Sequence, residues 1–296
     1  MNKELREFFD NNKINIKKIT IKGKVKIIEN EPQKLVIKKR TKDLKGLYKY
    51  LNSRSFSYFP PIIYSTLNYD IYQYINNTDL PIEEKAEDII KLISILHQKT
   101  TYYKDIDDNT YKELYENTIE KLNYLNNYYN DIAELIESEE FMSPSNYLFI
   151  RNISKIFQAL NYCKINIEKW YKIIEEKKRI RIVTIHNNLD LNHYLLDKKP
   201  YLISWQKSKK DLPIYDLINF YKKYYKELDF YNLLKLYENN YPLLKEEKIL
   251  LFILISIPEK VEFNNNIYNM CITIGNFYNY IQTTEKLITD YFPKQT

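Results

Sequence analysis

Residues 185–196 read IHNNLDLNHYLL, and residues 201–205 read YLISW. An apolar, β-branched run leads into His186, a short polar loop follows, and two apolar runs flank the turn at residues 197–200. Short apolar runs on either side of turn residues favour a β-hairpin. The stretch therefore predicts a strand, a loop and a hairpin in direct succession.

The residues before this stretch have the pattern of a small sheet with one helix. β-Rich runs occupy residues 14–20, 25–28, 34–38 and 71–75, and a turn is expected at residues 22–24. Apolar residues recur at helical spacing between Asp43 and Leu51, which predicts a helix there. We place the end of this β-rich part near residues 75–77.

The remaining residues are mainly helical. Helical patterns begin near residue 79, cover residues 111–136 and 147–174, resume near residue 214 and end with residues 267–291. The most apolar run, residues 249–257, is shorter than the roughly 20 residues that a membrane span needs. We expect it to be a buried helix that ends near Pro258, and we expect no insertion into a membrane.

Composition indicates a folded protein of the reducing cytoplasm. Hydrophobic residues make up 44% of the chain, which is enough for a core. The net charge of +6 is dispersed, whereas a nucleic-acid footprint is denser and confined to one face. Cys163 and Cys271 lack metal-type spacing and are expected to be buried free thiols. The acidic N-terminus does not have the pattern of a signal peptide.

The order of these elements resembles the aminoglycoside phosphotransferase and choline kinase group, and most closely its spore-coat kinase-like branch. Besides the 185–205 stretch, the resemblance rests on residues 96–100 (LHQKT), on residues 211–217 (DLPIYDL) and on a Pro-Pro pair at 60–61. It implies an α+β, bilobal protein kinase-like fold. A small antiparallel β-rich N-lobe would cover residues 1–75. A large helical C-lobe would cover residues 76–296 and carry the catalytic-type loop 186–205.

The loop departs from the family at the residues that carry the chemistry. The family pattern is roughly H-G-D-x-x-x-x-N, followed by an Asp on the next strand. Asn188 stands where the catalytic Asp belongs, and His193 and Ser204 stand where the metal-binding Asn and Asp belong. Phosphoryl transfer depends on a carboxylate that orients the nucleophile and on ligands that hold Mg²⁺. An amide cannot take the proton, and a hydroxyl and an imidazole are poor ligands for a hard cation.

The resemblance consequently implies a site with no catalytic residues and no metal. Asp190 is the carboxylate that remains in the loop, and it could act only in a displaced geometry. Lys38 stands at the position of the phosphate-binding lysine of the small lobe, although Lys34 and Lys39 are near alternatives and a solvated strand lysine is the competing interpretation. The helix that follows Lys38 lacks the glutamate that should pair with it.

Two further residues of the resemblance are expected to be structural. His186 opens the loop and should hold the turn by bonding to the backbone. Asp216 should anchor the loop or favour the first turn of its own helix.

These observations predict a pseudokinase, a catalytically inactive kinase-like protein that acts through protein partners. The resemblance suggests a role in spore-coat assembly, with coat proteins as partners, synthesis in the cytoplasm and no cofactor. Two alternatives stay open. One is an active phosphotransferase for a small molecule or sugar that uses Asp190, with ATP and Mg²⁺ as cofactors. The other is a ligand or nucleotide sensor without catalysis.

Overall fold

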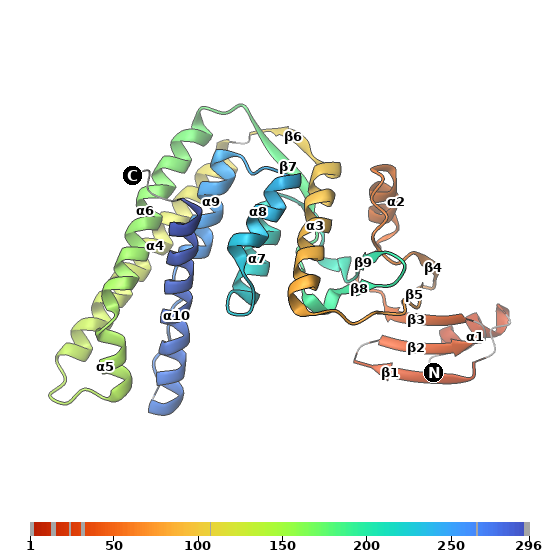
Figure 1. Cartoon of the computed structure of the whole chain (residues 1–296), viewed down its shortest axis with the longest axis horizontal. Helices are drawn as coiled ribbons and strands as arrows, with labels where there is room; N and C mark the ends of the chain where they lie inside the picture. The colour runs from red at the N-terminus through yellow and green to blue at the C-terminus, as the bar shows by residue number, and fades with distance from the viewer. Residues whose placement is uncertain are drawn as a thin grey trace. The chain divides into compact units, whose positions relative to one another are not determined.

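The computed structural model describes residues 3–12, 16–23, 25–30, 33–106, 108–264 and 266–292. The chain forms two compact units (Figure 1). Unit 1 comprises Met1–Thr100 and His186–Lys209, and unit 2 comprises Thr101–Ile185 and Lys210–Thr296. Loop 186–205 thus groups with the β-rich residues, whereas the sequence assigned it to the helical lobe. The expected lobe boundary near residues 75–77 stays a prediction.

Unit 1 contains a five-stranded antiparallel sheet in the order β1-β2-β3-β5-β4. Its strands are β1 (Lys18–Lys22), β2 (Val25–Asn30), β3 (Gln33–Lys39), β4 (Ile62–Ser65) and β5 (Tyr69–Gln73). The expected strands at 25–28 and 34–38 are confirmed as β2 and β3. The expected strand at 14–20 is found at 18–22, and residues 14 and 15 lie outside the described residues. Gly23, with a φ of +59°, lies in the turn after β1, and Lys24 is not described.

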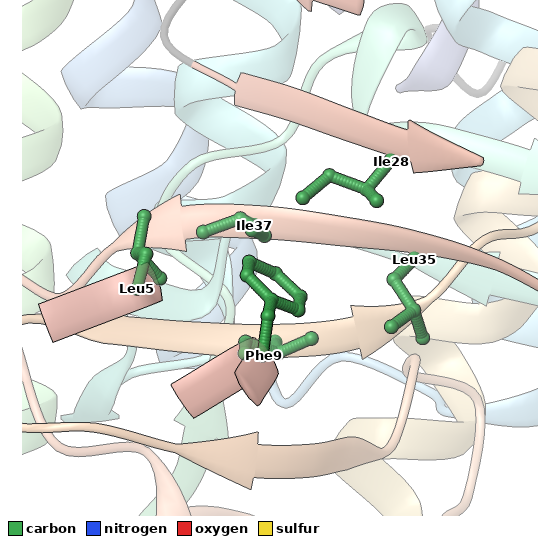
Figure 2. Packing of buried hydrophobic residues seen from close by; sticks show 6 residues of the cluster. Leu5, Phe9, Ile28, Leu35 and Ile37 are labelled. Atoms are coloured by element: carbon green, nitrogen blue, oxygen red, sulfur yellow. The ribbon is translucent and has the colours of Figure 1, made fainter. Parts of the chain in front are cut away.

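Helix α1 (Lys3–Asn11) covers one face of this sheet. Leu5 and Phe9, four residues apart and hence on one helical face, pack against Ile28, Leu35 and Ile37 (Figure 2). The sequence analysis did not predict this helix. A helix of nine residues is too short to be stable by propensity alone, and burial against the sheet supplies what propensity lacks.

The pleat of the strands determines which side chains lie on the other face of the sheet. Side chains alternate along a strand, so Val36 and Lys38 of β3 point away from the α1 side. The antiparallel register places Val25 opposite Lys38 and Ile27 opposite Val36. This second face lines the pocket described below.

The remainder of unit 1 consists of two helices and the loop stretch. The elements are α2 (Lys45–Ser53), α3 (Ile82–Thr100), η1 (Leu191–His193), β8 (Tyr194–Leu196), β9 (Pro200–Leu202) and η2 (Trp205–Lys207). The predicted hairpin is confirmed, because β8 pairs antiparallel with β9 and Leu196 lies opposite Pro200.

Polar contacts attach this hairpin to the first hundred residues. The Tyr194 hydroxyl donates to Asp88 of α3 at 2.6 Å, and the Leu202 amide donates to the carbonyl of Tyr58 at 2.8 Å. The Leu196 amide donates to the side chain of Asn77 at 2.9 Å. These bonds explain why residues 186–209 belong to unit 1.

Unit 2 is mainly helical. Its helices are α4 (Asp108–Glu137), α5 (Pro144–Ile150), α6 (Ile153–Glu175), α7 (Ile214–Tyr224), α8 (Phe230–Asn240), α9 (Lys245–Ser256) and α10 (Ile267–Tyr291). Strands β6 (Tyr102–Asp105), β7 (Arg179–Ile185) and β10 (Lys209–Asp211) form a sheet in the order β10-β7-β6. Helix α6 packs against α4 and α9 (Figure 1).

Two helices that were predicted from the spacing of apolar residues can be compared with the helices of unit 2. The predicted helix at 267–291 is confirmed as α10. The predicted helix at 147–174 is wrong as a single element, because it breaks between α5 and α6 at Arg151 and Asn152. At the break, the Asn152 side chain donates to the carbonyl of Leu148 at 3.0 Å.

The most apolar run is the buried helix α9, as predicted. Leu250, Leu251, Phe252, Ile253 and Ile255 are all buried. None of the helices in the described residues combines the length and the apolar composition that crossing a bilayer requires. Of the two free thiols, Cys163 is buried as expected and its pKa is raised to about 12 by burial. Cys271 is only half-buried, which corrects the expectation for that residue.

A buried ion pair joins β7 to α9. Arg181 donates from Nε to Glu247 at 2.9 Å and from Nη2 to the other carboxylate oxygen, and its guanidinium lies 4.1 Å from the ring centroid of Tyr241. Both charged side chains are almost wholly inaccessible to water. A buried pair of this kind is costly to break, because the remaining charge is left uncompensated.

We expect Phe9→Ala to lower the free energy of unfolding by about 3–5 kcal/mol, because it removes a large side chain and leaves a cavity under α1. Urea denaturation followed by circular dichroism measures this loss. Leu67→Ala is the control, since Leu67 is 83% exposed. A loss for Phe9→Ala no larger than for the control would mean that α1 does not dock on the sheet in solution.

We expect Glu247→Gln to destabilise the protein by about 3–5 kcal/mol, since it leaves the Arg181 charge buried without its carboxylate. The double variant Arg181→Met/Glu247→Leu should recover most of that loss, because it removes both charges together. Urea unfolding of the three proteins measures both effects. Equal losses for the single and the double variant contradict the prediction.

Candidate functional site

A pocket of about 350 Å³ lies within unit 1 between the second face of the sheet and the loop stretch. Its walls are largely apolar and aromatic. They are formed by Val25, Ile27, Val36, Tyr48, Pro60, Tyr72, Ile75, Leu195 and Ile203. Its polar lining consists of Lys38, Asn77, Asn192, Ser204 and Gln206, together with residues 73–74. A cavity of this size with few polar groups is typical of a small-molecule site.

Lys38 is the charged group of the pocket. Its Nζ lies 3.4 Å from Ser204 Oγ and 3.3 Å from Gln206 Oε1, both long for hydrogen bonds. Burial lowers the pKa of Lys38. In the described part of the chain its ammonium forms no ion pair, and Asp70, opposite it in the β3–β5 register, pairs with Arg40. The structure thus brings Lys38 to Ser204, while exposed Lys39 does not line the pocket.

Phenols occupy the part of the pocket next to α2. Burial raises the pKa of both Tyr48 and Tyr72, and the two side chains hydrogen bond to each other. Tyr48 also stacks on Phe59 at 4.1 Å between ring centroids. Helix α2 has no glutamate that could pair with Lys38, and its neutral Tyr48 lines this pocket instead.

The loop residues Asn188, His193 and Ser204 are brought together. Asn188 donates from Nδ2 to the carbonyl of Ser204 at 3.2 Å and accepts at its own carbonyl from His193 Nδ1 at 2.8 Å. Ser204 has a φ of +70°, a left-handed conformation that non-glycine residues rarely adopt. Three positions that the resemblance assigned to catalysis and metal binding therefore bond to one another and to the backbone.

Asp190 caps the short helix η1. Its carboxylate accepts from the Asn192 amide at 2.8 Å. Among the described residues, the lining of the pocket includes no aspartate or glutamate. The structure therefore uses this carboxylate locally and does not bring it to Lys38.

His186 and Trp205 form the base of the loop. His186 is fully buried, and its Nε2 donates to the carbonyl of Ile203 at 2.9 Å. Its ring packs edge-on against Trp205, with 4.6 Å between ring centroids. Trp205 Nε1 donates to the Leu202 carbonyl at 2.7 Å. These contacts have the form that a structural role requires. Asp216 is buried in the first turn of α7, in unit 2, and its anchoring role stays a prediction.

The residues present do not fit a magnesium ion. Mg²⁺ prefers oxygen ligands in octahedral geometry and is usually held by one or two carboxylates. The described residues contain no cluster of three or more His, Cys, Asp or Glu side chains that could hold a metal. The pocket presents an ammonium instead, which repels a divalent cation.

The loop beside the pocket also lies near positive charges. The pKa of His193 is lowered mainly by burial, and the nearby positive charges of Lys38 and Lys207 lower it further, against the opposing effect of its bond to Asn188. The imidazole is thereby favoured in its neutral form. Lys38 and Lys207 thus place positive charge beside the loop.

Sequence reasoning missed several residues of the pocket. Tyr48, Tyr72, Gln206 and Asn77 line it, and none was predicted to be functional. Gln206 lies two positions after Ser204, and this closeness in the sequence was the one indication that it lines the same site. The two tyrosines could not be distinguished from the 30 tyrosines of an aromatic-rich chain.

Comparison with solved structures supports the fold. An aminoglycoside phosphotransferase from Alicyclobacillus acidocaldarius subsp. acidocaldarius DSM 446 aligns with a TM-score of 0.64 at 7% identity, covering 95% of each chain. The AMP-bound spectinomycin phosphotransferase APH(9)-Ia aligns with a TM-score of 0.52 at 11% identity, covering 98% of this chain and 99% of the other. No protein-family model and no curated protein matches the sequence. The chain thus has an α+β, kinase-like fold, as predicted.

We expect His193 to titrate with a pKa below its usual value of about 6.5. NMR can follow it directly, because the chain has three histidines and His193→Gln assigns the signal. Since the folded pKa is lowered, the contribution of His193 to stability is complete above pH ~6.5 and is lost as the pH falls through that value toward the folded pKa. Lys38→Met should raise the pKa of His193, because it removes one repelling charge. A pKa of 6.5 or above in the unmodified protein contradicts this description of the site.

Proposed function

We propose that this chain is a kinase-like protein that binds a small organic anion in the unit 1 pocket and does not transfer phosphate. The observation that carries the proposal is the environment of Lys38. A half-buried ammonium faces Ser204 and Gln206 at long distances, with no carboxylate lining the described pocket. A ligand anion is the partner that this ammonium lacks.

The pocket also suggests the remainder of the ligand. The side chains of Val25, Ile27, Val36 and Ile203 give it apolar walls, and the lining reaches residues 73–75 at the end of β5. An apolar ring system with one anionic group matches this combination, because burial of the ring contributes affinity and the ammonium fixes its orientation. Nucleotides also combine an aromatic ring with anionic groups, and AMP is bound by one protein of similar fold.

The residues of the loop support the proposed absence of phosphoryl transfer. Asn188 is a neutral amide whose Nδ2 already donates to Ser204, and the hydroxyl of Ser204 lies beside Lys38. Asp190, the carboxylate on which the active alternative depends, caps η1. The sensor alternative of the sequence analysis thus gains support from an open pocket, and it is compatible with a pseudokinase. The role in spore-coat assembly stays a prediction from the resemblance.

The proposal is tested by calorimetric titration of ATP and ADP in EDTA and again with excess Mg²⁺. We expect binding in EDTA and no gain from Mg²⁺, which competes for the anion. Lys38→Met should weaken binding at least about tenfold, or ~1.4 kcal/mol, because it removes a charge-assisted contact. Lys39→Met is the matched control, since Lys39 is the next residue of β3 and is exposed.

Turnover is measured in the same preparations by release of ADP. We expect none, with or without Mg²⁺, and none in the double variant Asn188→Asp/Ser204→Asp, because Lys38 still lacks its carboxylate partner. ADP release that disappears in Asp190→Asn would establish the active phosphotransferase instead. If neither nucleotides nor a panel of anionic aromatic compounds binds, the pocket is not a ligand site and the proposal fails.

A further inference from the structure

The end of α4 and the segment that follows it expose an unusual amount of apolar surface. This α4–α5 tip, residues 131–150, comprises the last turns of α4, the connection and α5. Leu135 is 64% exposed, Phe141 85%, Met142 38% and Tyr147 57%. Single exposed apolar side chains are normal, whereas several gathered on one short segment mark an interaction surface.

The tip is held in a defined conformation. The carboxylate of Glu139 accepts from Asn146 Nδ2 at 2.9 and 3.0 Å, which folds the connection back onto α5. Ser143 caps α5 by accepting from the Asn146 amide at 3.2 Å. Phe141 and Met142 therefore lie in a connection whose conformation is held by hydrogen bonds on both sides. A surface that is ordered before binding loses less entropy when a partner docks.

Helix α10 extends this surface. It packs against α5, and the Tyr278 hydroxyl donates to the carbonyl of Phe149 at 2.7 Å. Figure 1 shows α5 beside the end at which α10 begins. In the first turns of α10, Tyr268 and Ile272 are four residues apart on one helical face and are both exposed. Residues 267–284 contain no charged side chain.

The charge of the tip differs from that of the remaining chain. The protein has 45 Lys and Arg residues among 296 and a net charge of +6. Residues 122–150 contain five acidic residues and no Lys or Arg, which gives this stretch a charge of −5. The acidic residues are Asp131, Glu134, Glu137, Glu139 and Glu140, and all of them are exposed. The charged residues nearest in the sequence to Leu135, Phe141 and Met142 are thus all acidic, and the first basic residue after the tip is Arg151, four residues beyond Tyr147.

We propose that the α4–α5 tip docks a basic amphipathic helix of a partner protein. The apolar face of such a helix would cover Phe141, Met142 and Tyr147, and its Lys and Arg residues would meet the glutamates around them. Complementary charge raises the rate of encounter and selects against acidic partners, and the aromatic side chains supply contact area. The inference rests on unit 2 alone and is independent of the pocket in unit 1.

The test uses the full chain and a fluorescent synthetic peptide of Lys and Leu placed at helical spacing. Fluorescence anisotropy should show at least about tenfold tighter binding than for a scrambled peptide of the same composition, because only the former has an apolar face. Phe141→Ser/Tyr147→Ser should weaken binding by at least about tenfold, as expected when central aromatic contacts are removed. Leu67→Ser, at an exposed apolar residue of unit 1, should leave binding unchanged.

Charge is tested separately. Glu134→Gln/Glu137→Gln should weaken binding of the amphipathic peptide, and added salt should weaken it in the unmodified protein more than in this variant. Equal binding of both peptides, or binding that survives Phe141→Ser/Tyr147→Ser, overturns the proposal. So does a concentration-dependent dimer in analytical ultracentrifugation that this double variant abolishes, because the surface would then belong to a second copy of the chain.

Discussion

The alternation of side chains along β3 is the constraint on which unit 1 depends. Leu35 and Ile37 must face α1 to close the core, and the pleat then directs Val36 and Lys38 to the opposite side. Shifting the register of the whole β3 strand by one residue would reverse both faces at once, placing an ammonium in the core. The position of the pocket and of its single charge thus follows from the burial of α1 on the far side of the same sheet.

A second constraint is electrostatic. The lining of the pocket carries an ammonium, several amides and several hydroxyls, and Asp70 on the neighbouring strand forms an ion pair with Arg40. A half-buried positive charge without an internal anion is unfavourable in the empty protein, as the lowered pKa of Lys38 indicates, and an anion that enters the pocket relieves this cost. The uncompensated ammonium therefore slightly destabilises the empty protein and favours binding of an anion. In a site with a lysine–glutamate pair, the glutamate would already compensate that charge.

The sequence predicted those parts of the fold that local pattern determines. The hairpin at 194–202, the strands at 25–28 and 34–38 and the last helix are each visible in a window of a few residues. It did not predict α1, whose stability comes from Ile28, Leu35 and Ile37, residues distant in the chain. It also joined α5 to α6, because the break at Arg151 and Asn152 contains neither proline nor glycine.

The candidate site was predicted only in part, because local sequence motifs mark some of its residues and the packing of distant elements places the others. Asn188, His193, Ser204 and Lys38 occupy motif positions, and the structure brings them into one unit. Asp190 looked available in the sequence, yet its carboxylate caps η1, a role that only the backbone geometry reveals. Tyr48, Tyr72 and Gln206 carry no motif, and their place in the pocket depends on how α2, β5 and η2 fold around it.

The bond from Asn188 Nδ2 to the carbonyl of Ser204 constrains which residues position 188 can accept. Aspartate at position 188 would set an anionic oxygen against that carbonyl, where an amide now donates. A carboxylate would be disfavoured there unless the backbone around Ser204 also changed. The loop therefore resists a negative charge introduced at position 188 alone.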